Sequence, residues 1–377
     1  MRDTLADPGL ARYAGRFVWL KLDFDRTENR PFVAGRGVPY TPSFYVIDPT
    51  NENATATQLG AMTLRELTAF LERGERGMTA RKPSFADGEL ARGDDLMARD
   101  RPAAAVSAYE AAHRAAGAGW SDRDRAVGAL IFARATSKQW EPCAEEAIAE
   151  APRLGRHETF GRVVLEGLKC VDAGEPSVWA ATSRPELERL AVEAIASPET
   201  VRDHRFQLYQ ELMATARERG DTAAVNRFGE AWLKELDSTA PENDDERSAL
   251  DIARVDAAMI MVVPLRVLPA LLASERSMPH NYNASLRVAQ MELLAGRLPD
   301  AIAACDRGLE RFPGPLGRAW LLQVQADALM KDGRGAEARR ALESALDAAG
   351  QIGPTQAREN NVARISKLLA EKEEKQQ

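Results

Sequence analysis

The sequence predicts an α+β protein of more than one domain. A small α/β part covers residues 1–75, a linker covers 76–83, an all-helical part covers 84–365, and a charged tail covers 366–377. Two observations predict this division. Apolar runs of strand length occur only in the first part, whereas from residue 84 onward Ala and Leu recur at helical spacing. The stretch between them, GERGMTARKPSF, combines charges, glycines and a proline, which is typical of a linker.

The first part contains three runs that favour strands. Residues 17–22 within RFVWLKLD are apolar on both alternating faces, as expected of a strand covered by helices on both sides. SFYVI at Ser43–Ile47 has the same character, and ATATQL at Ala54–Leu59 alternates with period two. Thr63 and Glu66 then form a capping box, which predicts the start of a helix.

The second part contains an internal repeat of the form small-x3-large-x2-small. Small residues four and seven apart on one helix face allow a neighbouring helix to approach closely. Successive starts differ by 39, 80, 77 and 37 residues, so one degenerate unit is expected in each long gap, near residues 187–194 and 265–272. About seven stacked helix pairs are predicted, enough for a continuous core. The pattern occurs at Ala105/Tyr109/Ala112, Ala144/Ile148/Ala151, Ala224/Phe228/Ala231, Ala301/Cys305/Gly308 and Ala338/Leu342/Ala345.

These repeats resemble tetratricopeptide repeats. Gly93, Ala105, Tyr109 and Ala112 fall at the family's small and aromatic positions, and Pro313 falls where the family ends a second helix. The period near 39 is longer than the family's 34, and several units lack the glycine of the first helix. The resemblance implies a divergent tetratricopeptide-like superhelix with a groove for a protein or peptide partner. An unrelated α-solenoid or a plain helical bundle is the alternative.

The first part looks like the C-terminal two-thirds of a thioredoxin domain over residues 3–73. The resemblance rests on FVWLKLDFD, followed by GVPYTPSFYVID, a turn, a strand and a helix. It implies that the Thr41–Pro42 bond is cis, and that Thr41 and Pro42 contact a bound peptide. The other interpretation of Pro42 is an ordinary trans proline at the first residue of a strand, where its missing N–H is tolerated.

The cysteines depart from the thioredoxin pattern. A reductase of that family needs C-x-x-C at a helix start, where the thiol pKa is lowered, and this chain has only the separated Cys143, Cys170 and Cys305. We therefore expect no catalytic residue and a redox-inactive domain. The alternative is a thiol–disulfide oxidoreductase whose C-x-x-C lies upstream of Met1. Three scattered cysteines predict no disulfide framework, and each fits a packed helix face.

Other chemistry is not indicated. The four histidines His113, His157, His204 and His280 have no zinc-site spacing, and neither a phosphate-binding loop nor a dinucleotide fingerprint occurs. The sequence therefore predicts neither a metal nor another cofactor. A net charge of -7 argues against nucleic acid, whose phosphates need a basic face.

The predicted function is a non-catalytic protein-binding scaffold with a protein or peptide partner. No apolar run is long enough to span a bilayer, and the first residues, MRDTLADPGL, lack the apolar core of a signal peptide. The expected compartment is the cytoplasm, or the periplasm of a bacterium if a signal peptide lies upstream. The oligomeric state is left open.

Overall fold

The computed structural model describes residues 4–5, 7–22, 27–36, 42–60, 62–78, 84–117, 119–155, 157–175, 177–312, 314–352 and 356–374. By internal packing the protein divides into two compact units, Met1–Leu208 and Tyr209–Gln377. We call them unit 1 and unit 2 and describe each by itself. No helix in these ranges combines the length and the apolar character needed to cross a membrane.

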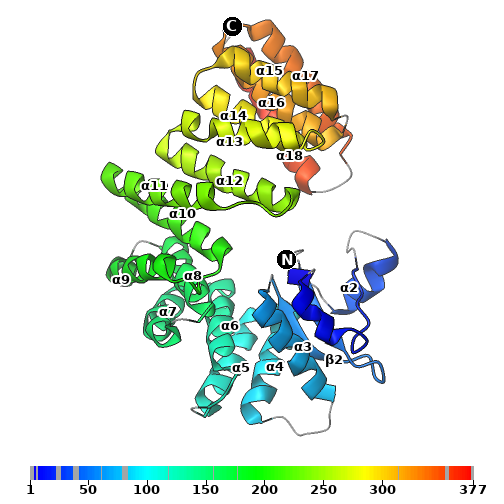
Figure 1. Cartoon of the computed structure of the whole chain (residues 1–377), viewed down its shortest axis with the longest axis vertical. Coiled ribbons are helices and arrows are strands. Elements are labelled where there is room, and N and C mark those ends of the chain that lie inside the picture. Colours follow the sequence, from blue (N-terminus) through cyan, green and yellow to red (C-terminus); the bar gives the residue numbers. More distant parts are fainter. Residues whose placement is uncertain are drawn as a thin grey trace. The chain divides into compact units, whose positions relative to one another are not determined.

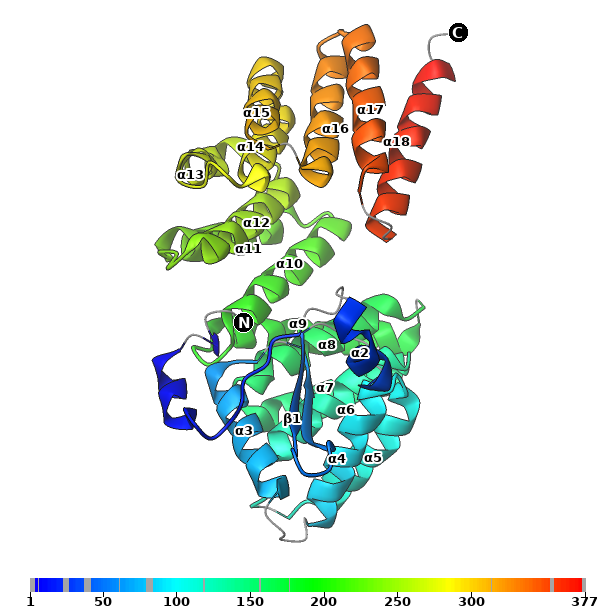
Figure 2. The same ribbon diagram turned by 90° about the vertical axis from the view of Figure 1, so that its right-hand side faces the viewer.

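Unit 1 contains a β-hairpin packed on one helix. Strands β1 (Ser43–Ile47) and β2 (Ala54–Leu59) are antiparallel, with Ser43 opposite Leu59. Helix α3 (Leu64–Met78) packs against both strands (Figure 2). Both strands and the helix confirm the sequence prediction. Their core consists of Tyr13, Val46, Met62, Leu67, Phe70 and Leu71.

The start of α3 shows the predicted capping box. The backbone N–H of Thr63 donates to the Glu66 carboxylate at 2.9 Å, and the Glu66 N–H donates to the Thr63 hydroxyl at 3.1 Å. Two N–H groups that the helix itself leaves without acceptors are thereby satisfied. At the open end of the hairpin, next to the Ser43–Leu59 pair, the Pro42 carbonyl accepts from the Gly60 N–H at 2.9 Å. Pro42 therefore leads β1, where its missing N–H costs least.

The prediction of a strand at residues 17–22 is wrong. The described part of the protein has a two-stranded sheet, β1–β2, and residues 17–22 form no part of it. Val18 and Leu20 are 89% and 78% exposed. A strand requires a neighbour that shares its ladder of hydrogen bonds, and an apolar alternating pattern does not supply one. The sheet is thus smaller than the one that the thioredoxin resemblance implies, and the short 3-10 helix η1 (Pro8–Tyr13) precedes residues 17–22.

The other described elements of unit 1 are helices, and two of them, η2 (Thr27–Asn29) and α2 (Arg30–Arg36), precede β1. Ser84 caps the first helix after α3 through a second capping box with Asp87. Each helix packs against the next, and α6 also contacts α8, as in tetratricopeptide-like stacks of helix pairs (Figure 1). The helices are α4 (Phe85–Ala98), α5 (Pro102–Ala115), α6 (Arg123–Thr136), α7 (Trp140–Leu154), α8 (Thr159–Ala173) and α9 (Val178–Ala196).

Helix α10 (Arg202–Glu218) spans the boundary between the units, and the rest of unit 2 is helical as predicted. The same packing recurs, because α12 contacts α14 and α14 contacts α16 in addition to their sequence neighbours. Pro313, expected at a helix end, lies outside the described residues. The helices are α11 (Thr222–Ser238), α12 (Asp244–Met261), α13 (Pro264–Ser277), α14 (Tyr282–Leu294), α15 (Leu298–Arg311), α16 (Pro315–Lys331), α17 (Gly335–Gly350) and α18 (Gln356–Glu374).

Candidate functional site

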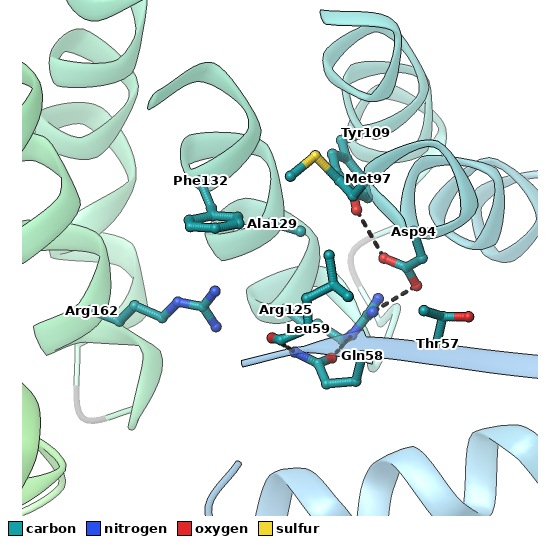
Figure 3. A pocket seen from close by; sticks show the side chains of 10 residues that line it. All are labelled: Thr57, Gln58, Leu59, Asp94, Met97, Tyr109, Arg125, Ala129, Phe132 and Arg162. Carbon is teal, nitrogen blue, oxygen red and sulfur yellow. Dashed lines mark hydrogen bonds and ion pairs between the residues drawn. The ribbon is translucent and has the colours of Figure 1, made fainter. Parts of the chain in front are cut away.

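Unit 1 contains a small pocket between β2 and helices α4, α5, α6 and α8 (Figure 3). Its volume of about 40 Å³ leaves room for a few water-sized groups. A carboxylate fits such a space, whereas a nucleotide does not. The lining residues are Thr57, Gln58 and Leu59 of β2, Asp94 and Met97 of α4, Tyr109 of α5, Arg125, Ala129 and Phe132 of α6, and Arg162 of α8.

Helical periodicity places these side chains together. Arg125, Ala129 and Phe132 are spaced by four and three residues, so they lie on one face of α6. Asp94 and Met97 are three residues apart on α4. Both helices therefore direct a stripe of polar and apolar side chains into the same pocket, and the end of β2 forms another wall of it.

Asp94 is the central acceptor of the pocket. The Tyr109 hydroxyl donates to Asp94 Oδ1 at 2.9 Å, and Arg125 Nη2 donates to Oδ2 at 2.6 Å. Burial raises the pKa of Tyr109 well above its ordinary value of 10, and the charge of Asp94 raises it further. Tyr109 therefore stays protonated and remains a donor at neutral pH.

Arg125 has one nitrogen without a partner. Besides its bond to Asp94, Arg125 donates from Nε to Gln58 Oε1 at 3.4 Å. Its Nη1 is buried and has no hydrogen-bond acceptor. Burial on its own would lower the pKa of Arg125, but the negative charge of Asp94 and its hydrogen bond raise it overall, so the guanidinium stays ionised. A buried donor without an acceptor costs about 1–3 kcal/mol, so Arg125 offers a favourable position to an added acceptor.

Arg162 is the second cation of the pocket. Its guanidinium carbon lies 5.7 Å from the centroid of the Phe132 ring, within cation–π range. Among the described residues no carboxylate forms an ion pair with Arg162, and Figure 3 shows its side chain extending from α8 toward the pocket. With Arg125 positive, Asp94 negative and Arg162 positive, the lining carries one net positive charge.

A second cluster of ligand-type side chains lies outside the pocket. Atoms of His113, Glu146 and Glu150 lie within 4.8 Å of one another. However, Glu146 already accepts from Arg134 at 3.1 Å, and Glu150 accepts from Arg123 at 3.2 Å. Guanidinium groups therefore neutralise both carboxylates, and we interpret the cluster as an ion-pair network.

The two residues expected to contact a peptide are not among those that line the pocket in the described part of the protein. Thr41 lies outside the described residues, and Pro42 is exposed at the start of β1. Tyr109 was selected only as a packing residue, and Arg125 and Arg162 were not selected. One signal was present for Arg162, because it is a lone charge within the apolar run FGRVVL of a buried helix.

The cysteines differ from their prediction as well. Cys143 and Cys170 form a disulfide, with their Cα atoms 6.2 Å apart, whereas Cys305 is free and buried. Burial raises the pKa of the Cys305 thiol to about 12, so it is unreactive. The pairing of Cys143 with Cys170 depends on how α7 and α8 align, which their spacing of 27 residues does not reveal.

No family model and no curated protein matches this sequence. Two solved structures are similar to it over much of its length. A tetratricopeptide repeat protein from Parabacteroides merdae has 8% identity and a TM-score of 0.43, covering 75% of this chain and 100% of that one. The TPR2AB domain of yeast Sti1, in a complex with pHSP90, has 13% identity and a TM-score of 0.30, covering 77% and 99%. The stacking of helix pairs is shown by the protein's own contacts, and neither similar structure bears on the pocket.

Proposed function

We propose that this protein is a helical-repeat binding protein, and that the pocket of unit 1 holds a carboxylate of a polypeptide partner. The observation that carries the proposal is the pair of guanidiniums, one with an unpartnered nitrogen and one without an ion pair, in a pocket of carboxylate size. The carboxylate belongs to a Glu or Asp side chain or to the C-terminus of the partner, which present the same group.

The chemistry of the lining supports this ligand. Hydrogen bonds between arginine and a carboxylate are charge-assisted and about twice as strong as neutral ones. An entering carboxylate would pair with Arg162 and would give Arg125 Nη1 the acceptor that it lacks. Leu59, Met97 and Phe132 provide apolar walls for the carbon atoms that carry the carboxylate. Asp94 already holds the other side of Arg125, so the guanidinium is oriented before the ligand arrives.

The experiment uses fluorescein-labelled peptides that end in Glu or Asp and matched peptides with amidated Gln or Asn ends. We expect the acidic peptides to bind the full-length protein and Arg162→Gln to weaken their binding roughly tenfold or more, because one charged partner is removed. Arg189→Gln is the control, since Arg189 lies on the surface of α9 and pairs with Glu186 at 2.6 Å. Equal binding of the acidic and amidated peptides would refute the proposal.

A second docking surface around Thr41 and Pro42 belongs to the same proposal. It is supported by the hairpin that follows an exposed Pro42 and by the helix α3 that packs on it, the order expected from the thioredoxin resemblance. Pro42→Ala should weaken a long peptide but leave a short acidic peptide, which reaches only the pocket, unaffected. Equal effects on both peptides would show that Pro42 acts on folding and not on docking.

A further inference from the structure

The disulfide lies at a point of close approach between α7 and α8. Cys143 and Cys170 are both fully buried, and their Cα separation of 6.2 Å is within the range that natural disulfides span. One turn away, a Cβ added to Gly167 would lie only 2.7 Å from the Ala147 Cβ. The small residues Ala147 and Gly167 thus allow the two helices to approach closely beside the sulfur atoms. This close packing places the two cysteines near enough to bond.

We propose that the Cys143–Cys170 bond is a permanent staple formed while the hairpin folds, and that the protein therefore matures where thiols are oxidised. Two thiols lose two protons and two electrons in this step. A disulfide donor, either a protein disulfide or oxidised glutathione, accepts them and leaves as two thiols. Disulfides of this kind persist in secreted, periplasmic or endoplasmic-reticulum compartments and are rare in a reducing cytoplasm.

Burial makes the bond permanent. Thiol–disulfide exchange requires a thiolate to reach one of the two sulfur atoms. Because both residues are 0% exposed, a reductant cannot reach them while α7 and α8 remain packed. The bond is therefore not a reversible switch of the folded protein, and it must form before the hairpin closes over it.

The expectation of a cytoplasmic location from sequence conflicts with this proposal, and counting thiols decides between them. The full-length protein is taken from its own cells under acid quench, denatured, alkylated with iodoacetamide and weighed by mass spectrometry. We expect one adduct, at Cys305, and three adducts after reduction in denaturant. Three adducts without reduction would overturn the proposal.

A second arm tests permanence. The folded protein is incubated with dithiothreitol, quenched, denatured and then alkylated. One adduct is expected again, and three adducts would show that the bond can be reached in the folded state. This measurement needs no variant, so it does not depend on the folding of a mutant.

Variants test the stapling effect. Closing a loop of 27 residues should raise the melting temperature of unit 1, so Cys143→Ser with Cys170→Ser should lower it by roughly 10 °C. The paired control is the single variant Cys305→Ser, which leaves the bond intact. An unchanged melting temperature in the double variant would contradict the structural role.

Discussion

The ring of Tyr109 occupies the space that a side chain on Gly93 would need. A Cβ built on Gly93 would lie 2.3 Å from Cε1 and 2.5 Å from Cδ1 of that ring. This approach of α5 to α4 also brings the Tyr109 hydroxyl to Asp94, the neighbour of Gly93 in sequence. A packing requirement of one helix pair therefore positions the central acceptor of the pocket.

Gly93→Ala should destabilise unit 1. A methyl group at this position must displace a fully packed ring, and overpacking of this kind costs about 1–3 kcal/mol. Alanine recovers up to about 1 kcal/mol of helix propensity, so we expect a net loss of about 1–2 kcal/mol in the free energy of unfolding. Urea denaturation followed by circular dichroism measures it.

Gly88→Ala is the matched control, because Gly88 lies in the same helix and a Cβ there meets nothing within 4 Å. This variant should be stabilised by up to about 1 kcal/mol. If both alanine variants were stabilised alike, the tight packing of Gly93 on Tyr109 would be disproved.

In unit 2, the stability of the fold should depend on one arginine that neutralises a buried carboxylate. Arg307 contacts Glu275 through two bonds of 3.1 and 2.9 Å, and the Ser285 hydroxyl donates to the same carboxylate at 2.8 Å. Glu275 is only 5% exposed. Arg307→Met should reduce the free energy of unfolding by about 3 kcal/mol, because it leaves a buried charge without its cation.

Two further variants identify the cause of this loss. Adding Glu275→Gln to Arg307→Met removes the stranded charge and should restore part of the stability. Arg339→Met removes one side of an exposed pair with Glu343 and should change stability by less than about 0.5 kcal/mol. Equal losses for Arg307→Met and Arg339→Met would mean that burial of Glu275 has no energetic consequence.

His204 should make unit 1 sensitive to mild acid. Burial, and then the positive charges of Arg162 and Lys169, lower the pKa of His204 from 6.5 to about 4. At a pH between 4 and 6.5, His204 binds a proton in the unfolded protein but not in the folded protein. The free energy of unfolding therefore falls as the pH falls from 6.5 to 4. The shift corresponds to about 3 kcal/mol at most.

Denaturant titrations at several pH values measure this effect. His204→Gln should lose most of the pH dependence in that window, whereas His280→Gln, at an exposed position, should keep it. A wild-type curve that ran parallel to that of His204→Gln would show that the imidazole does not titrate differently on folding.

The features of the fold that could be predicted are those that depend on residues close together in sequence. Ala338, Leu342 and Ala345 are all fully buried on α17, as the repeated pattern requires. The capping box at Thr63 was equally predictable, because its bonds join residues only three apart. Ala231 is an exception, since it occupies a small position of the pattern yet is exposed.

Features that depend on the alignment of separate elements could not be predicted. Arg125 and Asp94 are 31 residues apart and meet only because α4 and α6 border the same hollow. The Cys143–Cys170 bond likewise depends on the alignment of a helix hairpin. Residues 17–22 show the converse, because their pattern favours a strand but the hydrogen-bonding neighbour that a strand needs is not part of the pattern.

Val262 offers a test of backbone strain. It follows α12 in a left-handed conformation, with φ 57° and ψ 45°, which is unfavourable for a β-branched residue by roughly 1–2 kcal/mol. Its side chain is 66% exposed, so it contributes little packing. Val262→Gly should therefore raise the free energy of unfolding of unit 2 by about 0.5–1 kcal/mol, after allowance for the extra entropy of glycine in the unfolded state.

Ile252→Gly is the control for the general effect of glycine, because Ile252 is 50% exposed and lies inside the same helix. It should lower stability by about 0.5–1 kcal/mol, the opposite sign. Thermal unfolding of the two variants beside the wild type compares them directly. If Val262→Gly destabilised the protein as much as Ile252→Gly does, the left-handed turn after α12 would carry no strain at Val262, and the helix would have to end in another conformation.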